Sequence, residues 1–321
     1  MNILLWHVHG AWTTAFVQGP HTYLVPVLPH RGPGGAGRAR TYPWPDSVVE
    51  VTPAECLARA DDVDLVVLQR PEELSHLAEV WLGGRRPGRE VPAVYVEHNA
   101  PQGRVNDLRH PAADRDDVVV VHVTHFNRLF WDTGTAPVTV VEHGIPDPGE
   151  RWTGELDRVA VAVNEPVRRA RVTGTDLLPA FAAAVPLDLF GMGVAPLAGT
   201  LPGLEVFDDP PQARFHDELA RRRAYLHPFR WTSLGLTLLE AMHLGMPVVG
   251  LATTEAVEAV PPDAGVLSNR PEVLVDALRR LLADHDEARV RGKAAREAAL
   301  ARYGLHRFLA DWEELFVEVT R

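Results

Sequence analysis

Short apolar runs alternate with segments of helical period along the whole chain. In the first half the candidate strands cover residues 3–8, 22–28, 65–69, 93–97, 118–123 and 138–142. The pattern restarts with candidate strands at 158–163, 187–191, 224–227, 247–251 and 265–267, and with helices over 234–244 and 270–285. The runs are nearly all apolar, which is typical of parallel strands covered by helices on both faces. Strands that alternate with helices predict an α/β fold with parallel sheets.

The length of 321 residues suits two domains better than one. The turn-rich stretch 144–156 separates the two strand–helix patterns and is the predicted linker. We therefore expect an N-terminal domain over 1–150 and a C-terminal domain over 151–305.

The last helical segment places its apolar residues on one stripe, and such a face must dock on a partner surface. The stripe consists of Phe308, Leu309, Trp312, Leu315, Phe316 and Val319. We expect residues 306–321 to pack on the N-terminal domain.

Residues 29–45 are rich in Gly, Pro and Arg and have almost no apolar side chains before Tyr42. This composition predicts a mobile loop that packs no core. The simplest interpretation is a solvated excursion. The functional alternative is a flap on the acceptor side that carries Arg31, Arg38 and Arg40.

Composition excludes several classes of function. The net charge of −11 argues against nucleic acid or an anionic membrane as the main partner. The single cysteine, Cys56, allows no disulfide within the chain, which fits a reducing compartment.

The opening residues are interpreted as a buried first strand, not a signal peptide, and no apolar run reaches the ~20 residues of a membrane span. We expect a soluble, cytoplasmic protein. The many arginines beside one lysine indicate a GC-rich bacterial genome.

The most informative segment is 225–250, which is predicted as strand, loop, helix and second strand. The helix begins near Ser233 to Gly235, where its free N–H groups and dipole favour an anion such as a diphosphate. Thr232, Ser233 and Thr237 add hydroxyl groups beside that position. Glu240 follows one to two turns later, where a carboxylate can accept hydrogen bonds from a ribose diol.

This segment resembles the signature of family-4 retaining glycosyltransferases (glycosyl transferases group 1), in which a Glu-Gly-Phe-Gly-Leu start leads into Leu-Glu-Ala-Met and Gly-x-Pro-Val-Val. The matching residues here are Gly235, Leu236, Leu239, Glu240, Ala241, Met242, Gly245, Pro247, Val248 and Val249. The resemblance implies a GT-B fold, in which two Rossmann-like domains have parallel sheets that face a central cleft and a C-terminal helix crosses back to the N-domain.

The resemblance also implies the reaction. A sugar passes with retention from a nucleoside-diphosphate-sugar co-substrate to a hydroxyl of a small-molecule or glycan acceptor, with no metal and no other cofactor. The backbone amides of Leu236 and Thr237 would hold the diphosphate, and Glu240 the ribose. The sequence departs from the family at Thr232, which occupies the position of the first of two paired glutamates. In relatives that carboxylate contacts the donor sugar. A pseudo-glycosyltransferase, or a relative that only binds nucleotide-sugar, therefore remains an alternative.

Segment 157–180 resembles the first unit of the family's nucleotide-binding domain. Gly174-Thr175-Asp176-Leu177-Leu178 matches its Gly-x-Asp-Leu-Leu. The family places an Arg and a Lys before this motif, facing the diphosphate. The lysine position is Thr173, and the candidate arginines are Arg168 first, Arg169 second and then Arg171. A guanidinium binds phosphate well because its planar fork is bidentate.

The N-terminal half offers two further positions. The strand at 93–97 is followed by His98, where the resemblance places a histidine near the donor sugar. The catalytic candidates are therefore His98, Arg168 and Arg169. Gly10 follows the first strand and would let backbone approach phosphate. Trp12 would stack on a sugar or an apolar acceptor, or pack beneath the loop.

Other chemistries fit less well. His7, His9, His122, His125 and His143 lie near predicted strand ends, but carboxylate partners do not cluster with them, and no metal site is predicted. A dinucleotide fingerprint, a nucleophile elbow and a Walker motif are absent. An epimerase or phosphorylase on the same architecture would need its own catalytic acids or a cofactor lysine. The only lysine, Lys293, lies in a predicted surface helix.

Overall fold

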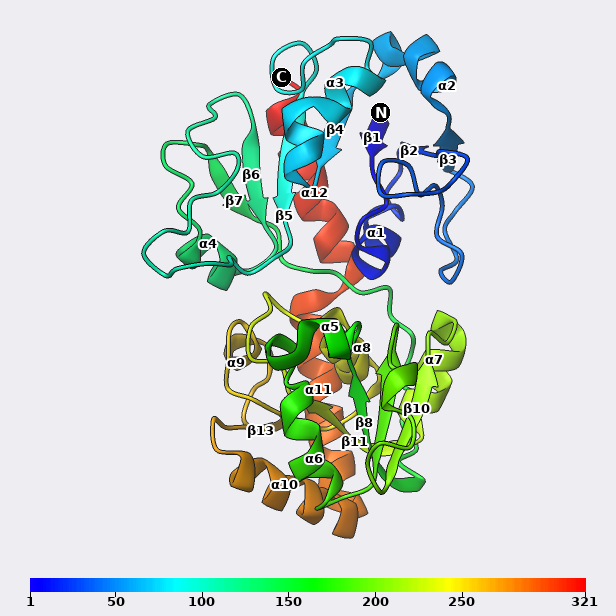
Figure 1. Ribbon diagram of the computed structural model, residues 1–321, viewed down its shortest axis with the longest axis vertical. Coiled ribbons are helices and arrows are strands. Elements are labelled where there is room, and N and C mark those ends of the chain that lie inside the picture. The colour runs from blue at the N-terminus through cyan, green and yellow to red at the C-terminus, as the bar shows by residue number, and fades with distance from the viewer. The chain divides into compact units, whose positions relative to one another are not determined.

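The computed structural model describes residues 1–321, which divide into two units (Figure 1). The first unit contains Met1–Gly144 and Leu305–Arg321, and the second contains Ile145–Gly304. The chain therefore changes unit at Gly144 rather than at residue 150, and the last helix belongs to the first unit.

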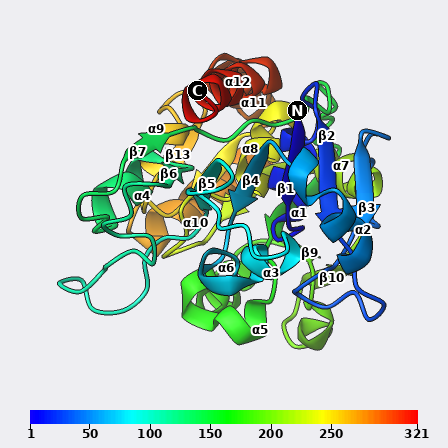
Figure 2. The same cartoon turned by 90° about the horizontal axis from the view of Figure 1, so that it is seen from above.

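The first unit is built on a seven-stranded sheet in the order β3-β2-β1-β4-β5-β6-β7, and every pairing is parallel. The strands follow one another across the view of Figure 2. Their bounds are β1 (Asn2–Leu5), β2 (Thr22–Pro26), β3 (Val48–Val51), β4 (Leu65–Leu68), β5 (Ala93–Glu97), β6 (Val119–His122) and β7 (Val138–Val140). The order reverses direction between β1 and β4. At such a switch point the loops diverge and leave room for a ligand.

Helices cover both faces of this sheet. The helical elements are α1 (Gly10–Phe16), α2 (Pro53–Ala58), η1 (Ala60–Asp62), η2 (Glu73–Leu77), α3 (Ala78–Trp81), α4 (His125–Phe130) and α12 (Leu305–Val319). On one face, Cys56 and Trp81 of α2 and α3 pack with Leu4 and Val66. Helices α1 and α12 meet through aromatic rings. Phe16 lies 5.0 Å from Trp312 between ring centroids and 5.6 Å from Tyr23 of β2.

The second unit is built on a six-stranded parallel sheet in the order β10-β9-β8-β11-β12-β13. The strands are β8 (Leu156–Ala162), β9 (Leu187–Gly191), β10 (Leu204–Asp208), β11 (Arg222–His227), β12 (Val248–Gly250) and β13 (Gly265–Leu267). In β8, Val159 and Val161 enter one core while Ala160 and Ala162 enter the other. The alternation follows from the period of two of a strand buried on both faces.

Helices fill the two cores of the second unit. Its elements are α5 (Pro166–Arg169), η3 (Ala170–Thr173), η4 (Thr175–Leu177), α6 (Leu178–Ala182), η5 (Ala195–Leu197), α7 (Gln212–Ala220), α8 (Leu236–Leu244), α9 (Ala256–Ala259), α10 (Pro271–Ala283) and α11 (His285–Tyr303). Phe215 of α7, Leu238 of α8 and Ala295 of α11 belong to one core, whereas Phe181 of α6 and Leu278 of α10 belong to the other.

All eleven predicted strands are present, and two further strands, β3 and β10, were not predicted. Both are edge strands. In β3, Val48 and Val51 are buried while Val49 is exposed, and β10 is buried only at Leu204. Each of these two strands exposes part of its length to solvent, so its apolar pattern is weaker than that of a strand buried throughout.

Segment 29–45 contains no helix or strand, but the prediction that it packs no core is wrong for Trp44. That side chain is 6% exposed, and its Nε1 donates a hydrogen bond to Thr14 Oγ1 at 2.8 Å. Arg38 donates to the carbonyls of Trp44, Pro45 and Val48, and Arg31 pairs with Glu50 at 2.8 Å. Both arginines therefore hold the segment together.

Candidate functional site

The second sheet has its switch point between β8 and β11, and the loops that follow these strands are joined. The Arg230 N–H donates to the Val172 carbonyl at 2.9 Å, and the Arg230 side chain pairs with Asp176. At Gly174, φ is +73° and a Cβ would lie 2.0 Å from the Pro228 carbonyl oxygen, so only glycine permits this approach. The two predicted phosphate-facing segments thus form one surface at the carboxyl edge of the sheet, where α/β folds bind ligands.

Helix α8 begins at this edge. Its N-cap is Gly235, and no side chain caps it, so the first N–H groups have no intrahelical acceptor. A Cβ at Gly235 would lie 2.8 Å from the His227 ring, which explains the glycine. Leu236 and Thr237 are half-buried in the first turn, and the Thr237 hydroxyl contacts Tyr225 Oη at 3.0 Å. Thr232 is half-buried and Ser233 is buried.

The structure separates the three candidate arginines. The Arg168 side chain is 72% exposed and contacts Glu165 at 3.4 Å. Arg171 pairs with Asp176 at 2.8 Å. Arg169 is half-buried, lies 5.7 Å from the Phe229 ring centroid, and has no carboxylate within ion-pair distance. Desolvation, and then the positive charge of Arg168, lower the pKa of Arg169. Arg169 is therefore the cation of this loop that lacks a counter-anion.

Backbone conformation sets this arrangement. The four-residue helix α5 lies between Glu165 and Ala170, whose φ angles are +56° and +40°. Non-glycine residues adopt positive φ at an energetic cost and cluster at functional sites. Thr173, by contrast, is fully buried, and its hydroxyl bonds the Ala170 carbonyl and Thr175 Oγ1, each at 3.0 Å. Its side chain supports the loop and does not reach the surface where a phosphate would bind.

Glu240 is 4% exposed and lies one turn into α8. Its Oε1 accepts a hydrogen bond from Gln212 Nε2 at 3.1 Å and lies 3.4 Å from His216 Nε2. Both partners belong to α7. The other carboxylate oxygen of Glu240, Oε2, makes no hydrogen bond within the second unit. The sequence did not predict Gln212 or His216, because neither lies near Glu240 along the chain.

In the first unit, the ends of β1, β4 and β5 bring a histidine cluster together. His98 is 9% exposed. Its ring centroid lies 4.2 Å from that of His9 and 4.8 Å from that of Trp12, and its Nε2 lies 3.0 Å from Gln69 Oε1. Burial, and then His9 and His143, hold the pKa of His98 well below its usual value. His98 is therefore neutral at physiological pH.

Trp12 and Gly10 have structural explanations. Trp12 is 1% exposed and stacks on Phe16 at 4.7 Å, so it packs beneath the loop. A Cβ at Gly10 would lie 2.7 Å from the Tyr42 ring. The glycine makes room for Tyr42, and the helix that it begins has only seven residues. The space needed by Tyr42 explains why residue 10 is a glycine. The role of Gly10 as a phosphate contact stays a prediction.

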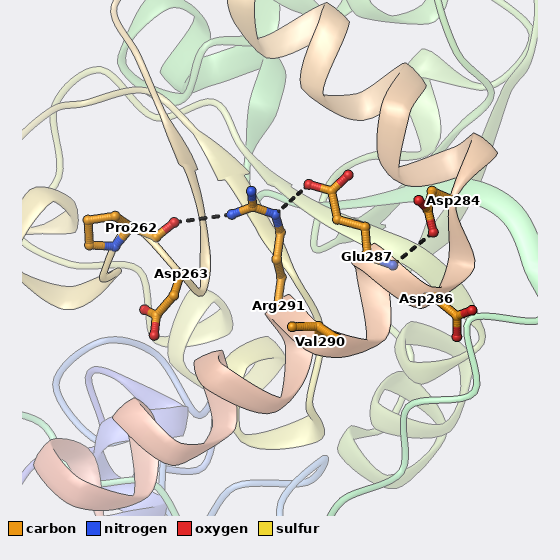
Figure 3. A pocket seen from close by; sticks show the side chains of 7 residues that line it. All are labelled: Pro262, Asp263, Asp284, Asp286, Glu287, Val290 and Arg291. Atoms are coloured by element: carbon orange, nitrogen blue, oxygen red, sulfur yellow. Dashed lines mark hydrogen bonds and ion pairs between the residues drawn. The ribbon is translucent and has the colours of Figure 1, made fainter.

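A separate pocket of about 460 Å³ lies at the N-terminus of α11 (Figure 3). It is lined by Pro262, Asp263, Asp284, Asp286, Glu287, Val290 and Arg291. Figure 3 shows Arg291 between the Pro262 carbonyl and Glu287, to which it donates hydrogen bonds. Four carboxylates against one engaged arginine would repel a diphosphate, and none of the predicted site residues lines this pocket.

The geometry places no group of three or more His, Cys, Asp or Glu side chains so that it could hold a metal ion. None of the helices combines the length and the apolar character needed to cross a membrane.

Residues 205–298 match the family model of Glycosyl transferases group 1. The matched segment includes α7, β11 and α8, and hence Glu240 with both of its partners. This match agrees with the glycosyltransferase predicted from the sequence, and it covers the segment 225–250 on which that prediction is based. Among curated proteins, none matches the sequence of the chain.

Solved structures share the whole fold. Anabaena Alr3699/HepE, in complex with UDP and glucose, has a TM-score of 0.70 at 16% identity, over 99% of this chain and 100% of that one. Sucrose-phosphate synthase (tll1590) from Thermosynechococcus elongatus has a TM-score of 0.69 at 14% identity, over 99% and 98%. These similarities confirm the predicted α/β, two-domain GT-B fold.

A third similar structure is a single-residue mutant of S. aureus TarM in complex with fondaparinux, alpha-GlcNAc-glycerol and UDP. Its TM-score is 0.65 at 14% identity, over 82% of this chain. The alignment spans 58% of the length of TarM, so this similarity, too, describes the fold.

Proposed function

We propose that the chain transfers a sugar from a nucleoside-diphosphate-sugar to a hydroxyl acceptor, with retention at C1 and without a bound metal. The observation that carries this proposal is the meeting of three features at the switch point of the second sheet. They are the uncapped N-terminus of α8, the unpaired Arg169 and the buried Glu240.

The diphosphate would bind the N–H groups of Leu236 and Thr237 at the start of α8, where the helix dipole is positive. Arg169 follows β8 and contacts the loop that leads to α8 through Phe229. Charge develops on the β-phosphate as its oxygen leaves C1. Preorganised donors at that oxygen stabilise the transition state without a metal. The proposed surroundings of the donor also include Arg168, Arg171, Thr232, Ser233 and Gly235.

Glu240 would bind the ribose. Gln212 and His216 hold its Oε1, which leaves Oε2 to accept hydrogen bonds from the diol. A carboxylate held from one side is preorganised, so less conformational entropy is lost when the ribose binds.

In the reaction, the bond from C1 to the β-phosphate oxygen breaks, and the acceptor oxygen bonds C1 from the same face. The acceptor's proton leaves with the nucleoside diphosphate. We propose that the first unit binds the acceptor, and that His98 contacts a substrate hydroxyl. We place the reaction in the cytoplasm, where a free cysteine such as Cys56 stays reduced.

The proposal is tested by a thermal-shift and hydrolysis screen against UDP-, GDP-, ADP- and dTDP-sugars in the presence of EDTA. UDP-sugars come first, because the HepE and TarM structures contain UDP. A donor at 100 times its dissociation constant should stabilise the fold by about 2.7 kcal/mol. Slow release of nucleoside diphosphate would identify the donor. If no nucleotide shifts the melting temperature, the donor site is not where we place it.

The pseudo-glycosyltransferase alternative is favoured by Thr232. This residue is half-buried beside the α8 N-terminus and carries no carboxylate for the donor sugar. A melting shift with a nucleotide-sugar but no hydrolysis and no transfer to any acceptor would support it. Turnover in the same assay would exclude it.

Replacing Glu240 with glutamine should raise the KM for the donor about fivefold and leave kcat nearly unchanged. The amide keeps the shape of the side chain but loses its charge, and hydrogen bonds to charged groups are about 1 kcal/mol stronger than neutral ones. The ribose is remote from C1, so the loss affects binding rather than the chemical step. Steady-state kinetics with the identified donor measure both parameters.

The matched control is Glu297→Gln on α11, where the side chain is 70% exposed. It should leave both kinetic parameters unchanged. Equal KM values for Glu240→Gln and the unaltered chain would remove Glu240 from the ribose site.

A further inference from the structure

Three consecutive strands of the first sheet are linked by one side-chain amide. Trp6, Gln69 and His98 each immediately follow a strand, namely β1, β4 and β5, which are neighbours in the sheet. Gln69 Nε2 donates to the Trp6 carbonyl at 2.7 Å, and Gln69 Oε1 lies 3.0 Å from His98 Nε2. Gln69 is 3% exposed, so water does not compete for these bonds.

These contacts determine which way the amide points. The Trp6 carbonyl can only accept a hydrogen bond, so the amino group of Gln69 must face it. The amide oxygen then faces His98, and Nε2 of His98 must carry the proton. A neutral imidazole has one N–H, so Nδ1 is unprotonated. No hydrogen bond within the first unit uses His98 Nδ1.

The position of Gln69 is further fixed by Glu73, which is fully buried. Glu73 Oε2 accepts from the Gln69 backbone N–H, and Oε1 accepts from Arg70 Nε, both at 2.6 Å. Gln69 is therefore fixed through its backbone as well as through both ends of its amide.

We propose that Gln69 is a positioning residue that fixes His98 as the Nε2–H tautomer, so that Nδ1 accepts a hydrogen bond from a substrate hydroxyl. The assignment deepens the proposed function and rests on it for the identity of that hydroxyl. It makes His98 an acceptor in the reaction, not a cationic donor to phosphate. The burial that keeps the ring neutral acts in the same direction.

The tautomer is measured directly by long-range proton–nitrogen NMR of the whole chain labelled at histidine, with His98→Gln to assign the signals. We expect the Nε2–H form in the unaltered protein. In Gln69→Met, which has similar volume but no amide, we expect a mixture of tautomers. We also expect a fall in kcat of about tenfold or more with little change in the donor KM. Losing a partner that orients a histidine costs about 10–100-fold at metal sites.

The control is Gln18→Met, because Gln18 also donates to a backbone carbonyl, that of Thr14, but contacts no histidine. It should change neither the tautomer nor kcat.

If Gln69→Met does not fold, Gln69→Glu serves instead. In its neutral carboxyl form this side chain donates its O–H to the Trp6 carbonyl and accepts from His98 Nε2–H through its C=O, so it preserves that tautomer.

A predominant Nδ1–H form in the unaltered chain or in Gln69→Glu overturns the assignment. Unchanged tautomer and kcat in Gln69→Met overturn it too. Failure of the proposed function would instead appear as absence of turnover in the unaltered chain. The tautomer is read without substrate and decides the assignment independently.

Discussion

Replacing Arg169 with methionine should lower kcat by about 100- to 1000-fold, or about 2.7–4 kcal/mol of transition-state stabilisation, as expected when a preorganised charge-stabilising donor is lost. Arg169 is half-buried against Phe229 and has no carboxylate partner. Burying an unpaired cation is unfavourable, and the lowered pKa of Arg169 reflects this cost. A diphosphate would supply the missing negative charge. Single-turnover kinetics with the identified donor measure the effect.

The same variant should be at least as stable as the unaltered chain without ligand. Methionine can still pack on Phe229, and the repulsion by Arg168 disappears. The melting shift caused by a nucleoside diphosphate should decrease at the same time. These opposite changes distinguish a ligand-binding cation from one that only supports the fold.

Arg168→Met is the matched control. Its side chain is 72% exposed and lies near Glu165, so we expect only a few-fold change, as for other solvent-screened ion pairs. If Arg168→Met abolishes transfer while Arg169→Met does not, the role belongs to Arg168, as the family resemblance alone implies.

Replacing Trp312 with alanine should lower the free energy of unfolding by about 3–5 kcal/mol, the usual cost of truncating a buried tryptophan. Trp312 is 1% exposed. Its ring lies 5.9 Å from Trp12, 5.0 Å from Phe16 and 5.6 Å from Phe316 between centroids. The substitution would leave a cavity between α1 and α12. Calorimetry and denaturant unfolding measure the loss.

Val317→Ala on the same helix is the control, because Val317 is 51% exposed. Its effect should stay within about 0.5 kcal/mol. Trp312→Phe should cost much less than Trp312→Ala, because the buried indole N–H makes no hydrogen bond and the phenyl ring keeps most of the contacts. Equal stability of Trp312→Ala and Val317→Ala would show that α12 does not depend on this cluster.

The sequence by itself determined the α/β class, the two repeated strand–helix patterns and eleven of the thirteen strands, because most of these strands are buried and their apolar runs are nearly continuous. It also located the α8 N-terminus and Glu240, since a strand, a glycine-containing turn and a helix are encoded within 26 consecutive residues, 225–250. These features depend on local pattern, which a single sequence displays directly.

Only the tertiary structure decided how the side chains are used. It buried Thr173, paired Arg171 with Asp176, left Arg169 without an anion and placed Trp44 in a core. It also joined Gln69 to His98, 29 positions apart, and Gln212 to Glu240, 28 positions apart. Such contacts depend on which strands become neighbours and on how their loops meet. Strand order is set by the packing of the whole sheet, and no local pattern of residues specifies it.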